Sequence, residues 1–169
     1  ERKGALIFYD NVYNDGMLYN WNIPNLANYL KQIDSHLKNG KSRDKLLKKS
    51  TDNRLKKLRH TPLYILNSSL INYDAFTAVE TPLDEIDDFF KKYPNKYKIV
   101  SEEELNKMYL EQEKPFYYLH TVKSSNRMLI NIVESSSGEP IYSAYSKVVG
   151  YNFRPKHLED IRKAIKRSK

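Results

Sequence analysis

The sequence contains no cysteine, which excludes disulfide bonds, thiolate metal sites and a cysteine nucleophile. It has five glycines, and they form neither a Walker-type loop nor a dinucleotide-binding loop. The nucleophile-elbow pattern G-x-S-x-G is also missing from the sequence. No apolar run approaches the ~20 residues that a membrane-spanning helix needs. The sequence therefore contains no motif that indicates an enzyme, and we expect that the protein is not an enzyme.

The four histidines do not form a metal-binding pattern, because no two of them lie at a spacing such as H-x-x-x-H. His120 falls in the middle of a predicted strand, beside Tyr118 and Val122. It is a candidate base, although a strand histidine that a neighbour or a water satisfies is the commoner case. We expect no metal, no cofactor and no catalytic residue. The histidines are His36, His60, His120 and His157.

Two groups of carboxylates follow the predicted starts of helices. Negative charge is favoured there by the helix dipole and by capping, and no apolar neighbour singles out one carboxylate for a raised pKa. Helix capping is therefore a better interpretation than an acid/base pair. The groups are Asp84, Glu85, Asp87 and Asp88, and Glu102, Glu103 and Glu104.

The most regular part of the sequence is residues 115–149, which predicts an antiparallel meander. Three segments rich in Tyr, Phe, Ile and Val, 116–122, 127–134 and 140–149, are separated by short polar breaks. These residue types suit a half-buried pleated surface, and breaks of this length are typical of hairpin loops.

The rest of the chain alternates predicted strands and helices. Apolar runs predict strands at 5–9, 63–66 and 97–100, with a further short strand at 73–79. Helical periodicity and capping signals predict helices at about 24–39 and 42–59, from Thr81-Pro82 to Tyr93, after Ser101, and over 155–166. The fold class is α/β, a mixed sheet that ends in the meander, with helices packed on it and a C-terminal helix. The 169 residues form one domain, in which 1–60 supplies a strand and two helices and 61–169 supplies the core of the sheet.

The positive charge of the protein is concentrated in one segment. The chain has a net charge of +8, and residues 38–59 hold ten Lys or Arg against two Asp, which accounts for the whole surplus. In the predicted helix 42–59, Leu47, Leu55 and Leu58 form an apolar stripe beside a basic stripe. The candidate polyanion-binding residues are Lys41, Lys45, Lys48, Lys49, Lys56 and Arg59.

The basic stripe is either an ordinary solvated helix face or a docking surface for an anionic partner. Nucleic acid is one such partner, since Phe116, Tyr118 and Tyr142, expected on an exposed aromatic face, would stack bases. The RNP motif of RNA-binding sheets is missing. Insertion into an anionic membrane is less favoured, because the apolar stripe lacks Trp and Phe.

Residues 63–166 resemble, in their order of elements, the α/β domains of the curli-secretion lipoprotein and of the Tol system's periplasmic protein (its amino-terminal domain). The opening strand Leu63–Leu66 resembles theirs. The strand at 97–100 and the helix ending in Glu111-Gln112 resemble their second step, and Ser137-Gly138-Glu139 resembles their turn between two strands. The closing helix matches as well. The resemblance implies a non-catalytic role in binding or assembly in the cell envelope.

Three functions remain, in order of preference. The first is a non-catalytic binding or assembly module, periplasmic or secreted, whose partner is a protein or an anionic molecule. The chain begins at Glu1 without a visible signal peptide, so either a leader has been removed or the chain has been trimmed, and we expect an exported protein rather than a cytoplasmic one. The second is a domain that binds nucleic acid or another polyanion through 42–59. The third is an unrecognised hydrolase that uses His120 or the acidic groups.

Overall fold

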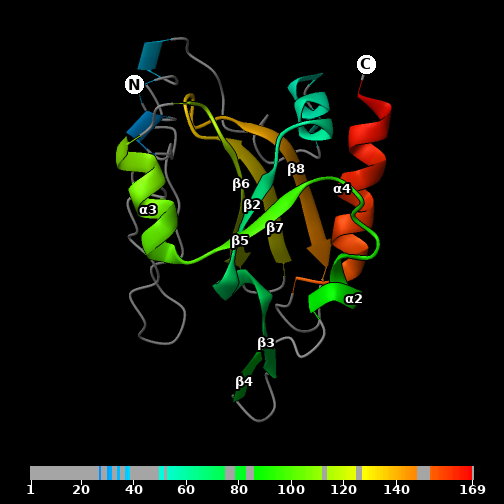
Figure 1. Cartoon of the computed structure of the whole chain (residues 1–169). Helices are drawn as coiled ribbons and strands as arrows, with labels where there is room; N and C mark the ends of the chain where they lie inside the picture. The colour runs from blue at the N-terminus through cyan, green and yellow to red at the C-terminus, as the bar shows by residue number, and fades with distance from the viewer. Residues whose placement is uncertain are drawn as a thin grey trace, which may run out of the picture.

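The structure is a computed structural model in which the chain can be described over six single positions between 27 and 38 and over residues 50–51, 53–74, 79–82, 86–111, 114–124, 127–147 and 153–168. The described elements interleave strands with helices and end in three consecutive strands and a helix (Figure 1), which is an α/β arrangement. No helix within these ranges is both long and apolar enough to cross a membrane.

A six-stranded mixed sheet lies at the centre, in the order β1-β8-β7-β6-β2-β5. Strands β6 (Tyr117–Ser124), β7 (Arg127–Glu134) and β8 (Pro140–Lys147) pair antiparallel, which confirms the predicted meander. The bounds of β7 are those predicted. Strand β2 (Leu63–Leu66) runs parallel to both β6 and β5 (Tyr97–Val100).

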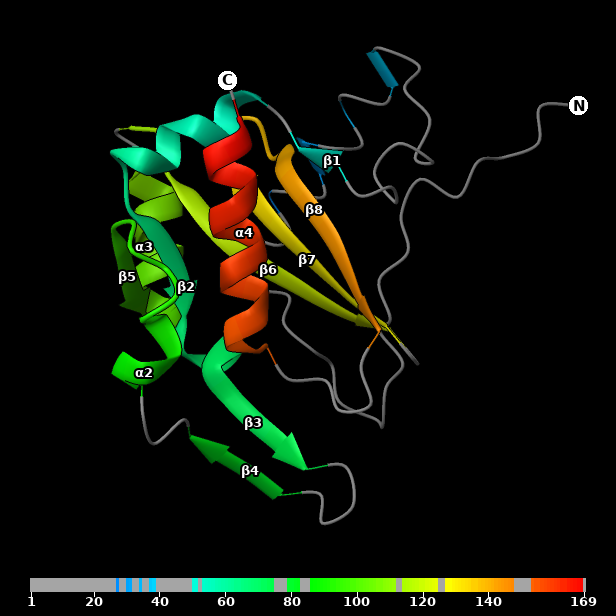
Figure 2. The same ribbon diagram turned by 90° about the vertical axis from the view of Figure 1, so that its right-hand side faces the viewer.

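Helix α4 (Pro155–Arg167) crosses one face of this sheet (Figure 2). Its apolar residues recur every three or four positions, which places them on one side of a helix. Leu158, Ile161 and Ile165 are at most 2% exposed and pack on the sheet in the larger core cluster. This confirms the predicted packing of the last helix.

Helix α3 (Glu102–Glu111) covers the other face of the sheet, where Leu105 and Tyr109 pack in a second, smaller cluster. Its start is the capping box predicted from the sequence. The Glu104 backbone N–H donates to Ser101 Oγ (3.1 Å), and the Ser101 N–H donates to Glu104 Oε2 (2.7 Å). Two backbone donors that a helix start leaves open are thereby satisfied.

The predicted helix over 42–59 is wrong as a single helix. Ser50–Thr51 is strand β1, which pairs with β8, and Asn53–Arg59 is the 3₁₀ helix η2. Leu55 and Leu58 are fully buried as predicted, because a spacing of three residues returns to one face in a 3₁₀ helix as in an α-helix. Pairing with the edge of β8 outweighs the helical periodicity at positions 50–51. Leu47 lies outside the described residues.

The segment 67–90 also differs from its prediction. Instead of one strand at 73–79 and a helix from Thr81-Pro82, it contains the 3₁₀ helix η3 (Asn67–Leu70), strands β3 (Ile71–Asp74) and β4 (Val79–Pro82), and the short helix α2 (Ile86–Phe90). Strands β3 and β4 form a separate two-stranded sheet with Pro82 opposite Ile71. Proline suits the end of an edge strand, since its missing N–H breaks no ladder there.

The remaining predictions lie near the amino terminus. The six described positions in the predicted helix 24–39 are all helical. The predicted strand 5–9 lies outside the described residues.

Candidate functional site

A basic surface forms where η2 lies beside the carboxyl-terminal end of α4. The two elements lie side by side in Figures 1 and 2, although they are about a hundred residues apart in the sequence. We define the basic surface by four exposed side chains from these two elements. They are Lys56, Arg59, Lys166 and Arg167.

Arg59 fixes the two elements to each other. Its guanidinium donates to the backbone carbonyl of Ile165 (3.0 Å) and to that of Ser168 (2.6 Å). The last carbonyls of a helix lack intrahelical donors and carry the negative end of the helix dipole. A cation at this point therefore stabilises α4, and the last-turn residues Lys166 and Arg167 are favoured for the same reason. The two backbone segments that carry the basic surface are consequently held next to each other.

The opposite side of η2 is held by ion pairs with the β7–β8 turn. Arg54 donates to Glu134 (2.7 Å) and to Glu139 (2.9 Å), and the Lys57 ammonium lies 3.7 Å from Glu134. Leu55 and Leu58 anchor the same helix in the core. Because Arg54 and Lys57 are paired with carboxylates, they add little free positive charge to the surface, which leaves Lys56 and Arg59 as the outward cations of η2.

Glu134 is the central acceptor of this turn. Its carboxylate accepts hydrogen bonds from the Tyr117 hydroxyl (3.0 Å) and from the Ser137 hydroxyl (3.1 Å). Burial alone would raise the pKa of Glu134, but these two hydrogen bonds and the charges of Arg54 and Lys57 bring that pKa below its usual value. Glu134 is therefore an ion at neutral pH, suited to hold η2 in place and unsuited to act as a general acid.

The structure brings together part of the predicted polyanion-binding set. Lys56 and Arg59 are exposed on η2, whereas Lys41, Lys45, Lys48 and Lys49 lie outside the described residues. Lys166 and Arg167 were missed in the sequence, because nothing in a linear pattern brings 56–59 next to 166–167. The only sequence feature that could have indicated them is the pair of basic residues at the end of the predicted closing helix.

The expected aromatic binding face is wrong. Phe116, Tyr118 and Tyr142 are 7%, 1% and 2% exposed. Tyr118 packs in the cluster beneath α3, whereas Tyr142 packs beneath α4 on the other face of the sheet. Both faces of these strands are covered by helices, so alternate aromatic residues are buried on both sides. These rings therefore cannot stack bases together.

His120 belongs to a neutral polar row across the meander. It lies opposite Asn131 in the β6–β7 ladder, and Asn131 lies opposite Ser143 in the β7–β8 ladder. The Ser143 hydroxyl donates to Asn131 Oδ1 at 2.8 Å. Burial lowers the pKa of His120 to about 4, so its imidazole is uncharged at neutral pH. Ser143 is turned toward the amide and is itself buried, an arrangement that suits packing rather than nucleophilic attack.

The acidic groups are used for local structure where the structure describes them. Glu102, Glu103 and Glu104 lie in the first turn of α3, and Asp88 pairs with Lys91. The side chains of Asp84, Glu85 and Asp87 lie outside the description. Within the described part of the chain, no three His, Cys, Asp or Glu side chains are grouped so that they could hold a metal ion.

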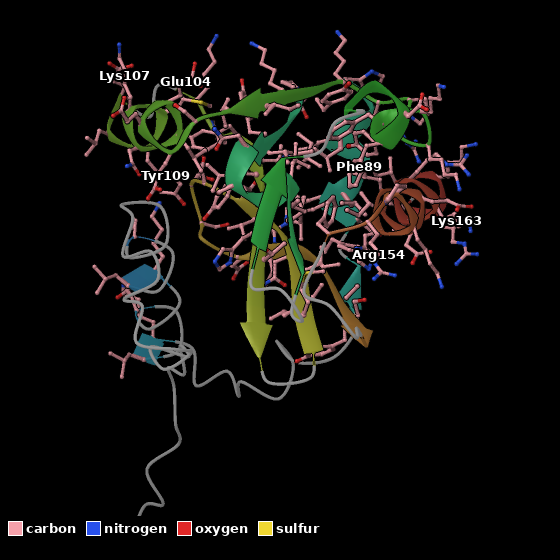
Figure 3. The ribbon with its side chains drawn as sticks, turned by 90° about the horizontal axis from the view of Figure 1, so that it is seen from below. Phe89, Glu104, Lys107, Tyr109, Arg154 and Lys163 are labelled. Carbon is pink, nitrogen blue, oxygen red and sulfur yellow. The ribbon has the colours of Figure 1, made fainter. Side chains whose placement is uncertain are left out.

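Exposed lysines elsewhere on α3 and α4 differ from those of the basic surface, because they are paired with carboxylates. Figure 3 shows Lys163 and Arg154 of the α4 side at one flank, and Glu104 and Lys107 of α3 at the opposite flank. On α4, Lys163 pairs with Glu159 (2.9 Å), and on α3, Lys107 lies 3.7 Å from Glu111. Unlike these paired lysines, the four residues of the basic surface form no ion pair with a carboxylate in the described part of the chain.

No protein-family model matches this sequence, and no curated protein and no solved structure is significantly similar to it.

Proposed function

We propose that this protein is a non-catalytic binding or assembly module of the cell envelope, and that it docks an acidic protein segment on the basic surface. The observation that carries the proposal is the joining of η2 to the end of α4 by Arg59, which holds four exposed cations from distant parts of the chain in one place. The resemblance of residues 63–166 to envelope domains supports the location and the absence of catalysis.

An acidic polypeptide fits the basic surface better than nucleic acid does. Sequence-tolerant binding of single strands depends on exposed aromatic side chains on which bases stack. The aromatic residues expected to supply such a platform are in the core. Three of the four cations are also Lys or a helix-capping Arg, which offer point charges rather than a free bidentate fork for phosphate.

Binding of poly-L-glutamate to the full chain tests the proposal, with duplex DNA titrated in parallel. We expect the polypeptide to bind at low salt and to dissociate as salt is added, because exposed charges are screened. The double variant Lys56→Glu/Lys166→Glu should weaken this binding by at least about tenfold, since it replaces two attractions with two repulsions. Arg59 is left intact because its loss would open the end of α4.

The matched control is Lys98→Glu/Lys107→Glu, which changes the net charge by the same amount on exposed lysines of the α3 side, since Lys98 lies over Tyr64 of the cluster beneath α3. This control should bind poly-L-glutamate nearly as tightly as the unmodified chain. Equal losses in both double variants would show that net charge, and not the basic surface, attracts the polypeptide. Tight binding of DNA with no binding of poly-L-glutamate would replace the proposal with nucleic-acid binding.

A further inference from the structure

The central sheet ends at β5 with an open edge. In the strand order β1-β8-β7-β6-β2-β5, β5 is the last strand and is paired with β2 alone. It lies at the border of the fold in Figures 2 and 3. Within the described part of the chain, no strand pairs with its outer side. Such an edge presents N–H and C=O groups that a further strand can bind.

The hydrogen bonds to β2 show which backbone groups of β5 are open. The Leu63 N–H donates to the Lys96 carbonyl oxygen (3.0 Å), and Leu63 lies opposite Tyr97 in the parallel ladder. Alternate residues of a strand face the same neighbour, so Lys96 and Lys98 direct their backbone groups toward β2. The N–H and C=O of Tyr97 and Ile99 therefore point outward, and the hydrogen bonds of the described residues leave them unused.

A groove lies at the start of the same strand. Its volume is about 400 Å³, and it is lined by Pro62, Pro94, Asn95, Lys96, Tyr97 and Lys98. The two prolines and the tyrosine ring give it an apolar lining, and the two lysines add positive charge. A strand that pairs with β5 would pass this groove and could place an apolar side chain in it.

The charge along the edge selects the kind of strand that fits. Lys96 and Lys98 are exposed, and their spacing of two residues places both on one side of the strand. Pairing with β5 of a second copy would bring lysines against lysines, which is unfavourable. Carboxylates at alternate positions of the added strand would instead lie opposite the lysines. Its other residues would lie beside Tyr97 and Ile99, which pack against the larger core cluster, and should therefore be apolar.

We infer that β5 binds an extended segment of a partner protein in which acidic and apolar residues alternate, and that this segment adds to the sheet as a further strand. Backbone hydrogen bonds give affinity in this mode of binding, and alternate side chains give specificity. The inference goes beyond the proposed function, because it uses none of the four residues of the basic surface. Poly-L-glutamate does not fit the β5 edge, since it has no apolar side chain and would place carboxylates beside Tyr97 and Ile99 as well.

The probe is a capped, fluorescently labelled peptide of alternating Val and Glu, titrated into the full chain and followed by anisotropy. A strand has two edges, and N-methylation of every second residue blocks only one of them. At least one of the two half-methylated peptides should bind like the unmethylated one. Methylation of every residue should weaken binding by at least about tenfold, because no strand donor remains.

Variants of β5 test the same contact from the side of the protein. Ile99→Pro removes an outward N–H that the sheet itself does not use, a position at which an edge strand tolerates proline. It should weaken peptide binding by at least about tenfold. The matched control Ile99→Ala shortens the same side chain but keeps the N–H, and it should lose much less. Lys98→Glu should also weaken binding, whereas Lys107→Glu on α3 should not. Circular dichroism checks that each variant is folded.

The outcomes separate this inference from the proposed function. Lys56→Glu/Lys166→Glu should lose poly-L-glutamate and keep the Val/Glu peptide, and Lys98→Glu/Lys107→Glu should do the reverse. If the peptide is lost in the first variant and kept in the second, it docks on the basic surface and the inference is overturned, while the proposed function stands. Equal binding of the fully methylated peptide, equal binding by Ile99→Pro, or no binding of the Val/Glu peptide would each overturn the inference too.

Discussion

The two faces of the central sheet contain different kinds of polar group, ion-paired on one face and uncharged on the other. Beneath α4 the core is apolar as far as its edge, where Glu134 is ion-paired with Arg54 and Lys57. Beneath α3 the smaller core gives way to a row of uncharged groups, His120, Asn131 and Ser143. The charges lie where solvent still reaches their partners, since the Arg54 side chain is 31% exposed.

The comparison shows how burial selects the kind of polar group. A buried ion needs a partner and further hydrogen bonds to offset its desolvation, and Glu134 has both. A buried neutral group needs only hydrogen bonds, and the depressed pKa of His120 keeps it in this second class. We therefore expect the α4 face to be sensitive to lost volume and lost charge, and the α3 face to be sensitive to acid.

The largest expected effect is on the α4 face. Ile161→Ala removes a fully buried side chain from the main core cluster, and it should lower the free energy of unfolding by about 2–5 kcal/mol. Urea denaturation followed by circular dichroism measures the change. The control is Lys163→Ala, on the exposed side of α4. A loss below about 1 kcal/mol for Ile161→Ala would mean that α4 is not packed as described.

The α3 face should respond to acid through His120. Its pKa is about 4 when folded and about 6.5 when unfolded, so the unfolded chain binds the extra proton between these values. Stability is therefore complete above about pH 6.5 and falls as the pH drops toward 4, by about 3 kcal/mol in total. His120→Asn should remove this part of the pH dependence, as measured by urea denaturation from neutral to acid pH.

His60→Asn is the control for that measurement, because His60 is exposed. It should keep the pH dependence of the unmodified chain. The interpretation of the neutral polar row fails if His120→Asn and the unmodified chain lose stability in parallel between pH 7 and 4.

A smaller effect is expected at the charged edge of the α4 face. Glu134→Gln leaves Arg54 without its closest carboxylate and should cost about 1–3 kcal/mol at neutral pH. Because the pKa of Glu134 is lowered on folding, its contribution is present above its unfolded pKa and is lost as the pH falls through the lower folded pKa. The difference in stability between the variant and the unmodified chain should therefore start to shrink below about pH 4.3, the unfolded pKa of a glutamate, and vanish below the lower folded pKa.

Glu139→Gln is a matched comparison, since Glu139 contacts the same arginine at 2.9 Å but is more exposed, at 37% against 9%. It should cost less than Glu134→Gln at neutral pH, because a solvated ion pair contributes little. Equal costs would show that Glu134 is not the centre of this turn.

The smallest effect concerns a neutral contact on the α3 face. The hydroxyls of Tyr109 and Tyr118 lie 3.3 Å apart between α3 and β6. Tyr118→Phe should cost about 1 kcal/mol, and a double-mutant cycle with Tyr109→Phe should give a coupling of about 0.5 kcal/mol or more. Strict additivity of the two changes would indicate that the hydroxyls do not interact.

The sequence predicted the elements in which local signals and tertiary packing agree. The strand Leu63–Leu66, the capping box of Ser101 and Glu104, and the buried face of α4 are each specified by residues close together in the chain. It was wrong where pairing with a distant partner decides, as at Ser50–Thr51, which joins β8, and in the β3–β4 hairpin. Helical periodicity describes one segment and contains no information on such pairing.

The candidate site divides in the same way. The sequence by itself determined the concentration of positive charge near Lys56 and Arg59 and the α/β alternation, because composition and periodicity are properties of the linear chain. Tertiary structure alone decided that Lys166 and Arg167 join the basic surface and that Phe116, Tyr118 and Tyr142 are buried. The physical reason is that burial and charge proximity depend on which segments pack together, and here the packing joins residues about a hundred positions apart.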